Sequence, residues 1–236
     1  MNKEDSMDVI RAIRSRRSIR SFKSNPISKE VLEELLHICL WAPSSSNTQP
    51  WEFAVIGGKV MEKSKVRLVD KVKAEWDSSK GIFRNMNPDI PSPKFSEPYL
   101  HRASTLKARI DRHQFPPGTE ELDKKRSKYL LYGASFYGAP NAIILYTERF
   151  LCPKAFVDLG IMAQTIAIVS LEYQLATCLM MMPVFWPDIF RDLLEIPKSK
   201  IIALSIAIGY PDNQAVVNTF KRTREPLDTF VSWHGI

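Results

Sequence analysis

The segment 153–174 constrains the fold most, because it predicts a long helix that is apolar on most of its faces. Its apolar side chains are Phe156, Val157, Leu159, Ile161, Met162, Ala163, Ile166, Ile168 and Val169. A helix that is hydrophobic all round is buried on all sides. A chain of 236 residues achieves such burial most easily with the help of a second subunit. The sequence therefore predicts a homodimer that covers this helix.

The other periodicities predict a single domain over residues 1–236, in which helices and strands are mixed. Helices are expected at 29–41, 59–78, 120–136 and 187–194, and strands at 51–57, 142–147, 176–182 and 201–209. The elements between 59 and 136 do not form clean strand–helix–strand units. This pattern favours an α+β fold over a doubly wound sheet.

Composition and charge narrow the class of protein. The net charge of +7 fits an anionic ligand, and it leaves open whether that ligand is a cofactor phosphate or a nucleic acid. Cys39, Cys152 and Cys178 lie in apolar surroundings without metal or disulfide spacing, so we expect buried thiols in a reducing compartment. We find no secretory signal, and the apolar runs 161–171 and 201–208 are short for a membrane span. The expectation is a cytoplasmic protein without a metal, a membrane or a nucleic-acid partner.

Two short segments near the N-terminus carry chemistry. In the first, Arg16, Arg17 and Arg20 place guanidinium groups around the hydroxyl of Ser18, which suits a phosphate or a delocalised anion. The alternatives are a solvated helix end or a nucleic-acid patch. The second segment, 42–53, is a run of short hydrogen-bonding side chains between two prolines that leads into a strand. One amphipathic helix separates the two segments.

Together these segments resemble the flavin mononucleotide (FMN) site of the nitroreductase family. The family's Arg-x-Ser-x-basic motif is matched by Arg16, Arg17, Ser18 and Arg20. The resemblance implies that these residues hold the FMN phosphate, the ribityl chain and the pyrimidine edge of the flavin, with Arg20 at that edge. It also implies a nitroreductase-like fold: a central, mostly antiparallel sheet flanked by helices, in an entwined homodimer.

The family's Pro-Ser-Ser-x-Asn loop is matched by Pro43, Ser44, Ser45 and Asn47. In the family this loop reaches the flavin that is bound mainly by the other subunit. Trp51 completes a Gln-Pro-Trp signature, and we interpret it as a core aromatic residue at the start of a strand.

Two further segments continue the resemblance. Arg222 and Arg224 match a basic pair that joins the phosphate site, although a solvated basic tail is the alternative. The backbone amides of Met180 and Met181 correspond to the segment beside flavin N5. The chain departs from the family at Gly133, near which many members carry an asparagine that touches the flavin ring. We assign no catalytic residue, because the cofactor carries the chemistry.

The resemblance implies an FMN-dependent oxidoreductase that takes a hydride from NADH or NADPH and reduces nitroaromatic or quinone-type acceptors in a ping-pong cycle. Reductive dehalogenation or flavin fragmentation in the same superfamily is an alternative, although Asn47 and Gln49 count against the deiodinase-like members. A basic nucleic-acid-binding protein is an alternative from another class, which leaves the serine-rich loop unexplained.

The segment 80–118 is rich in proline and shows no long hydrophobic period, so we expect a lid-like insertion over the flavin. Its run 95–100 resembles nitrobenzoate-type reductases. Its aromatic residues, which we expect to stack on a small aromatic acceptor, are Phe83, Phe95, Tyr99 and Phe115. Arg102, Arg109 and Arg112 are candidates to meet a carboxylate on that acceptor, or a wet face of a short helix.

Overall fold

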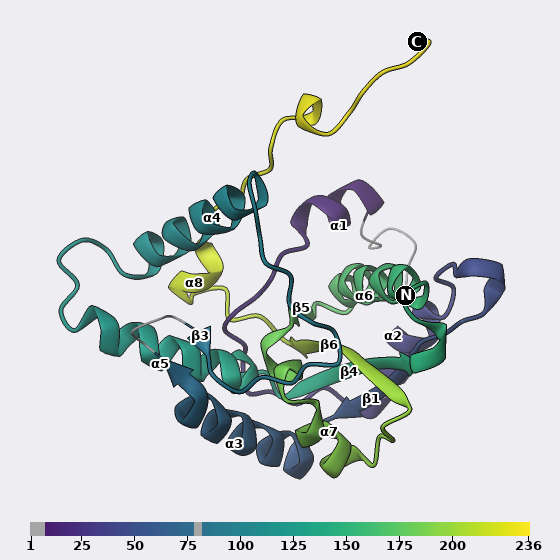
Figure 1. Cartoon of the computed structure of the whole chain (residues 1–236), viewed down its shortest axis with the longest axis horizontal. Helices are drawn as coiled ribbons and strands as arrows, with labels where there is room; N and C mark the ends of the chain where they lie inside the picture. The colour runs from purple at the N-terminus through teal and green to yellow at the C-terminus, as the bar shows by residue number, and fades with distance from the viewer. Residues whose placement is uncertain (1–7, 78–81) are drawn as a thin grey trace.

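A four-stranded antiparallel sheet forms the centre of the molecule (Figure 1). The computed structural model describes residues 8–77 and 82–236. The strands lie in the order β1-β4-β6-β5 and are β1 (Glu52–Ile56), β4 (Asn141–Glu148), β6 (Lys200–Gly209) and β5 (Ala176–Met180). Each neighbouring pair in this sheet is antiparallel, which confirms the expected α+β class and the mostly antiparallel sheet.

The two central strands are buried on both faces, which explains their continuous apolar sequences. Ile143, Ile144 and Leu145 of β4 are all fully buried, although successive side chains point to opposite faces of a strand. Ile144 belongs to one hydrophobic core, and its two neighbours belong to a second core on the other face. The sheet is therefore the middle layer of three.

One outer layer consists of α2 (Lys29–Cys39) and α6 (Ala155–Glu172), which pack against each other (Figure 1). Ser28 caps α2 by accepting a hydrogen bond from the backbone amide of Val31 at 3.3 Å. On α6, Leu159, Met162 and Ile166 pack onto the sheet. The other layer consists of α3 (Gly58–Glu75), α5 (Leu122–Ala134) and α7 (Pro187–Leu194).

Helix α6 is the apolar helix expected at 153–174, but one chain does not bury it on all sides. In the described part of the chain it is the one helix that has the length and composition to cross a membrane, a test that core helices also pass. Only 44% of it is buried. Val157 on α6 is 68% exposed, and the neighbouring α1 (Val9–Ser15) also exposes Val9 and Ile13. Apolar side chains are thus left uncovered on α6 and on the neighbouring α1.

The insertion differs from its expectation, because it contains a helix of 16 residues, α4 (Tyr99–Gln114). Helix α4 has no buried residue, because its apolar residues at helical spacing, Leu106 and Ile110, line the two cavities and are not packed in the core. The expected insertion start at residue 80 and the expected helix end at residue 78 lie outside the described residues.

The first part of the insertion is anchored to the core. Strands β2 (Trp76–Asp77) and β3 (Ile82–Phe83) pair in antiparallel orientation, and the ring of Phe83 meets that of Trp186 edge-on, with 5.1 Å between the ring centroids. Phe83 therefore packs in the core, and the expectation that it stacks on an acceptor is wrong. Asp89 pairs with Arg191 at 2.6 Å, with both side chains about nine-tenths buried, and accepts the amide of Ile202 at 2.8 Å.

The cysteines and Trp51 follow their expectations, with one exception. Cys39, Cys178 and Trp51 are buried, whereas Cys152 is half-buried. All three thiols are free. Among residues 8–77 and 82–236, no group of three histidine, cysteine or acidic side chains lies close enough to hold a metal ion.

Candidate functional site

The arginine motif follows α1 and is pinned along the open edge of the sheet. The backbone amide of Ile19 donates to the carbonyl of Thr177 on β5 at 3.0 Å, and Ser18 forms a parallel bridge with the same residue. Ile19 is buried, whereas the neighbouring Arg16, Arg17 and Arg20 keep part of their surface open. The sheet edge thus fixes a row of three guanidinium groups.

The C-terminal segment closes over this row. Arg17 donates to the carbonyl of Phe220, and Arg222 donates to the carbonyl of Arg14. Asn218, in the short helix α8 (Val216–Thr219), accepts the backbone amide of Arg20 at 2.7 Å and donates to the carbonyl of Ser21 at 2.8 Å. Sequence reasoning missed Asn218, because a single asparagine in an aperiodic tail carries no signal.

A cavity of about 430 Å³ lies where these segments meet, and seven arginines line it. They are Arg16, Arg17, Arg20, Arg102, Arg109, Arg222 and Arg224. Glu225 is the one carboxylate in the lining, and none of the seven forms an ion pair within the described residues. The fold therefore brings Arg16 and Arg17 together with Arg222 and Arg224, the two arginine pairs that the sequence analysis assigned to one phosphate site.

Seven arginines against the single carboxylate of Glu225 leave an excess of positive charge in this cavity, and that excess contributes to the lowered pKa values of two of the arginines. Burial lowers the pKa of Arg16, and the charges of Arg222 and Arg224 lower it further. Burial also lowers the pKa of Arg17, with smaller contributions from Arg222 and Arg20. An anion in the cavity would relieve this repulsion, and a phosphate accepts several charge-assisted hydrogen bonds at once.

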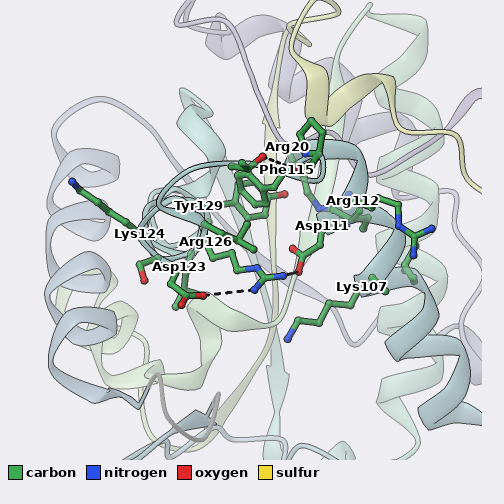
Figure 2. Close-up of a pocket in the computed structure, with 18 of the residues that line it drawn as sticks. Arg20, Lys107, Asp111, Arg112, Phe115, Asp123, Lys124, Arg126 and Tyr129 are labelled. Atoms are coloured by element: carbon green, nitrogen blue, oxygen red, sulfur yellow. Dashed lines mark hydrogen bonds and ion pairs between the residues drawn. The ribbon is translucent and has the colours of Figure 1, made fainter.

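A second cavity of about 1310 Å³ adjoins the first, and both are lined by Arg20, Leu106 and Ile110. It lies between α4 and α5 (Figure 2). The ring of Tyr129 lies 6.4 Å from that of Phe115 and 5.8 Å from that of Tyr137, so one wall is aromatic. Burial raises the pKa values of both tyrosines above the ordinary value for a phenol.

The methionine segment reaches the larger cavity at its end. The carbonyl of Met180, the last residue of β5, accepts a hydrogen bond from Ser205 at 2.9 Å. Met181 is 42% exposed, and the next residue, Met182, lines the cavity beside Gly133. A Cβ atom at Gly133 would lie 3.3 Å from Met182 Cε, the end of a flexible side chain, so a larger residue here would require only a small shift of Met182.

Helix α4 borders both cavities and divides the three arginines of the insertion between them. Arg102 and Arg109 line the smaller cavity, and Arg112 lines the larger one. The expectation that all three face one acceptor is therefore wrong, because α4 runs along the boundary. Across the larger cavity, Arg126 of α5 pairs with Asp111 of α4 at 3.0 Å (Figure 2).

The serine-rich loop lies away from both cavities within one chain. None of Pro43, Ser44, Ser45 and Asn47 lines either cavity. The loop is held to α6 instead, because the amide of Ser45 donates to Asp158 at 3.2 Å. Ser46, Asn47 and Gln49 have φ values of 51°, 54° and 46°. Non-glycine residues in this left-handed region are uncommon and cluster at functional sites.

The fold and the site define an α+β protein with an arginine-lined anion cavity that opens into an aromatic one. The model of the nitroreductase family matches residues 13–210, and the chain belongs to this family.

Relatives and solved structures agree. A 4-nitrobenzoate reductase from Pseudomonas putida is 27% identical over 240 residues, covering 98% of this chain and 96% of the relative. An FMN- and NADPH-dependent nitroreductase from Sphigopyxis sp. strain HMH superposes with a TM-score of 0.87 at 22% identity, covering 98% of this chain and 100% of that one. An FMN-dependent nitroreductase from Mycobacterium smegmatis, solved in complex with NADPH, gives 0.84 at 24% identity, covering 95% and 97%.

Proposed function

We propose that this protein is an FMN-dependent oxidoreductase that accepts electrons from NADH or NADPH and reduces nitroaromatic or quinone-type acceptors. One observation carries the proposal: a 430 Å³ cavity lined by seven arginines opens, at Arg20, into a larger cavity with an aromatic wall. Such a pair of chambers fits a ligand with a phosphate at one end and a flat ring at the other. When bound, FMN supplies hydride transfer between a nicotinamide donor and an electron-poor acceptor.

The phosphate end is assigned to four arginines, and the ring end to Arg20 and the methionine segment. The smaller cavity is lined by Arg16, Arg17, Arg222 and Arg224, which would donate to the phosphate together with the hydroxyl of Ser18. Arg20 lies where the cavities join, so it would stabilise negative charge at the pyrimidine edge of the ring. The backbone amides of Met180 and Met181 are assigned to the side of flavin N5, because the next residue lines the larger cavity.

We also propose a homodimer with composite sites. The uncovered apolar surface at α1 and α6, which includes Val9, Ile13 and Val157, suits a second subunit. The strained loop of Pro43, Ser44, Ser45 and Asn47 lies away from its own chain's cavities, so it is available to the partner's site. Free cysteines support a reducing, cytoplasmic location.

The domain is a single unit in which α4 is the lid of the larger cavity. The part of the insertion before α4 is tied to the core by Asp89 and Phe83. Helix α4 itself has no buried residue and forms one wall of the cavity, where the Arg126–Asp111 pair joins it to α5. We therefore restrict the moving part to 99–118.

Purification of the full chain tests the proposal directly. We expect a yellow protein whose cofactor, released by denaturation, is FMN and not riboflavin or FAD. Steady-state kinetics with either nicotinamide donor and a nitroaromatic acceptor should give parallel double-reciprocal lines, the pattern of a ping-pong cycle.

Two other outcomes would redirect the assignment. A yellow protein that turns over iodinated or chlorinated phenols, and not nitroaromatics, would support reductive dehalogenation. A colourless protein that binds no added FMN and shifts DNA with a steep salt dependence would support nucleic-acid binding and overturn the proposal.

A further inference from the structure

Helix α4 is held in place by polar contacts with the C-terminal segment that carries two of the phosphate-site arginines. Arg109 donates from Nη1 to the hydroxyl of Thr223 at 2.5 Å and from Nη2 to the carbonyl of Lys221 at 3.2 Å. These two acceptors flank Arg222 in sequence. The planar guanidinium of Arg109 therefore donates hydrogen bonds on both sides of Arg222, to the backbone before it and to the side chain after it.

Two neighbouring contacts also join α4 to the C-terminal segment. The guanidinium of Arg109 lies over the ring of Phe220, 5.5 Å from its centroid. One helical turn further along α4, Nε2 of His113 lies 3.1 Å from the carbonyl of Val216 and 3.0 Å from the hydroxyl of Thr219. The segment 216–224 is thus held between α4 and the arginine motif, to which Arg17 ties the carbonyl of Phe220.

We propose that Arg109 is a positioning residue: it holds the segment 221–224 so that Arg222 and Arg224 face the phosphate, and it thereby couples the lid helix to cofactor binding. This inference rests on the proposed function. Its physical basis is that mutually repelling arginines do not converge without a scaffold, and Arg109 supplies hydrogen bonds to neutral acceptors that fix them. By linkage, a phosphate that orders this segment also stabilises docking of α4, and docking of α4 strengthens phosphate binding equally.

The dissociation constant of FMN, measured from the fluorescence of free FMN at equilibrium, tests this inference. We expect Arg109→Ala to weaken FMN binding about tenfold, since it removes two hydrogen bonds from a charged donor. Riboflavin, which has no phosphate, should bind with unchanged affinity. Arg67→Ala is the control, because it removes the same charge from the surface of α3, where Arg67 lines neither cavity and pairs with Asp192 at 2.8 Å.

Two variants separate positioning from direct attraction of the phosphate. Thr223→Val removes one acceptor and no charge, so positioning predicts weaker FMN binding and non-additivity with Arg109→Ala. Arg109→Lys keeps the charge but not the fork, so positioning predicts that most of the loss remains. Full rescue by lysine together with a silent Thr223→Val would overturn the inference in favour of direct attraction.

Hydrogen exchange supplies a readout that does not depend on turnover. In the wild-type protein, addition of FMN should slow exchange at 99–114, and the slowing should be lost in Arg109→Ala. If the wild-type protein binds no FMN, the proposed function itself fails. If it binds FMN and Arg109→Ala matches the Arg67→Ala control in affinity and exchange, this inference alone is overturned.

Discussion

Arg16→Ala should have opposite effects on the FMN-free protein and on FMN binding. In the FMN-free protein, burial and the charges of Arg222 and Arg224 lower the pKa of Arg16, so its charged form is disfavoured in the folded state. Removing that charge should therefore raise the melting temperature of the FMN-free protein. The same substitution removes a donor to the phosphate, so FMN binding should weaken.

The magnitude follows from the contacts that are lost. A hydrogen bond to a charged group contributes about 1.5–3 kcal/mol. Because about 1.4 kcal/mol corresponds to a tenfold change in affinity, Arg16→Ala should weaken FMN binding between about tenfold and about a hundredfold. At a fixed excess of FMN, tenfold weaker binding removes about 1.4 kcal/mol from the ligand-induced stabilisation. The thermal shift caused by FMN should therefore shrink.

The assay compares melting temperatures with and without FMN, alongside the dissociation constants of FMN and riboflavin. Arg67→Ala is a suitable control, because it removes the same charge from α3, where Arg67 pairs with Asp192 at 2.8 Å on the surface. The control should leave the FMN-induced shift unchanged. If Arg16→Ala binds FMN as tightly as the wild type and the FMN-free variant gains no stability, the placement of the phosphate is wrong.

Four further predictions address the rest of the molecule. Sedimentation should show a dimer. Val157→Glu, which puts a charge on the uncovered face of α6, should produce a monomer with weakened FMN binding. A stable, flavin-loaded wild-type monomer at micromolar concentration would contradict the composite site. Asp89→Ala should lower the free energy of unfolding by about 3–5 kcal/mol in urea titrations, because it leaves the buried Arg191 with Asp188, at 3.8 Å, as its remaining carboxylate partner. A loss below about 1 kcal/mol would show that Asp188 or water compensates for the lost carboxylate. An acidic nitroaromatic should be reduced with a higher kcat/KM than its neutral ester. The side chain of Lys107 lines the larger cavity and extends toward Arg126 in Figure 2, so Lys107→Ala should reduce this difference in kcat/KM. Equal kcat/KM values for the acid and the ester in the wild type would exclude a cationic acceptor site. Burial raises the pKa of Cys39 from 9.0 to about 12, so the stabilisation from its buried neutral thiol is complete below pH 9 and is lost as the pH rises toward 12. Urea titrations across this pH range should show the decline in the free energy of unfolding. Rapid labelling of Cys39 by a thiol reagent at pH 8 would argue against its burial.

Features that depend on contiguous residues could be predicted from the sequence of this protein. The arginine motif and the serine-rich loop are contiguous runs, so their residue types and spacing are visible without any folding. Strands β4 and β6 and helix α6 could be predicted because each buries enough apolar surface to give a clear hydrophobic pattern in the sequence. Together with the resemblance, these elements were sufficient for the fold class and the family, which the comparisons confirm.

Tertiary structure decided the features that depend on contacts between distant residues. Helix α4 was not expected as a long helix, because its apolar stripe, which includes Leu106 and Ile110, is short and lines cavities, and no residue of the helix is buried in the core. The roles of Asn218 and Asp89 were missed, since their partners, Arg20 and Arg191, lie about two hundred and one hundred positions away. A polar side chain has the same appearance in a sequence whether it faces water or satisfies a buried donor.

The division of the three insertion arginines shows the same limit. Their spacing places them on one helix, but only the packing of α4 along the boundary of two cavities assigns Arg109 to the C-terminal segment and Arg112 to the larger chamber. Sequence by itself determined which charges and which apolar segments this protein has. The folded chain decided which of those charges converge, because that depends on where the sheet edge, α4 and the C-terminal segment meet in space.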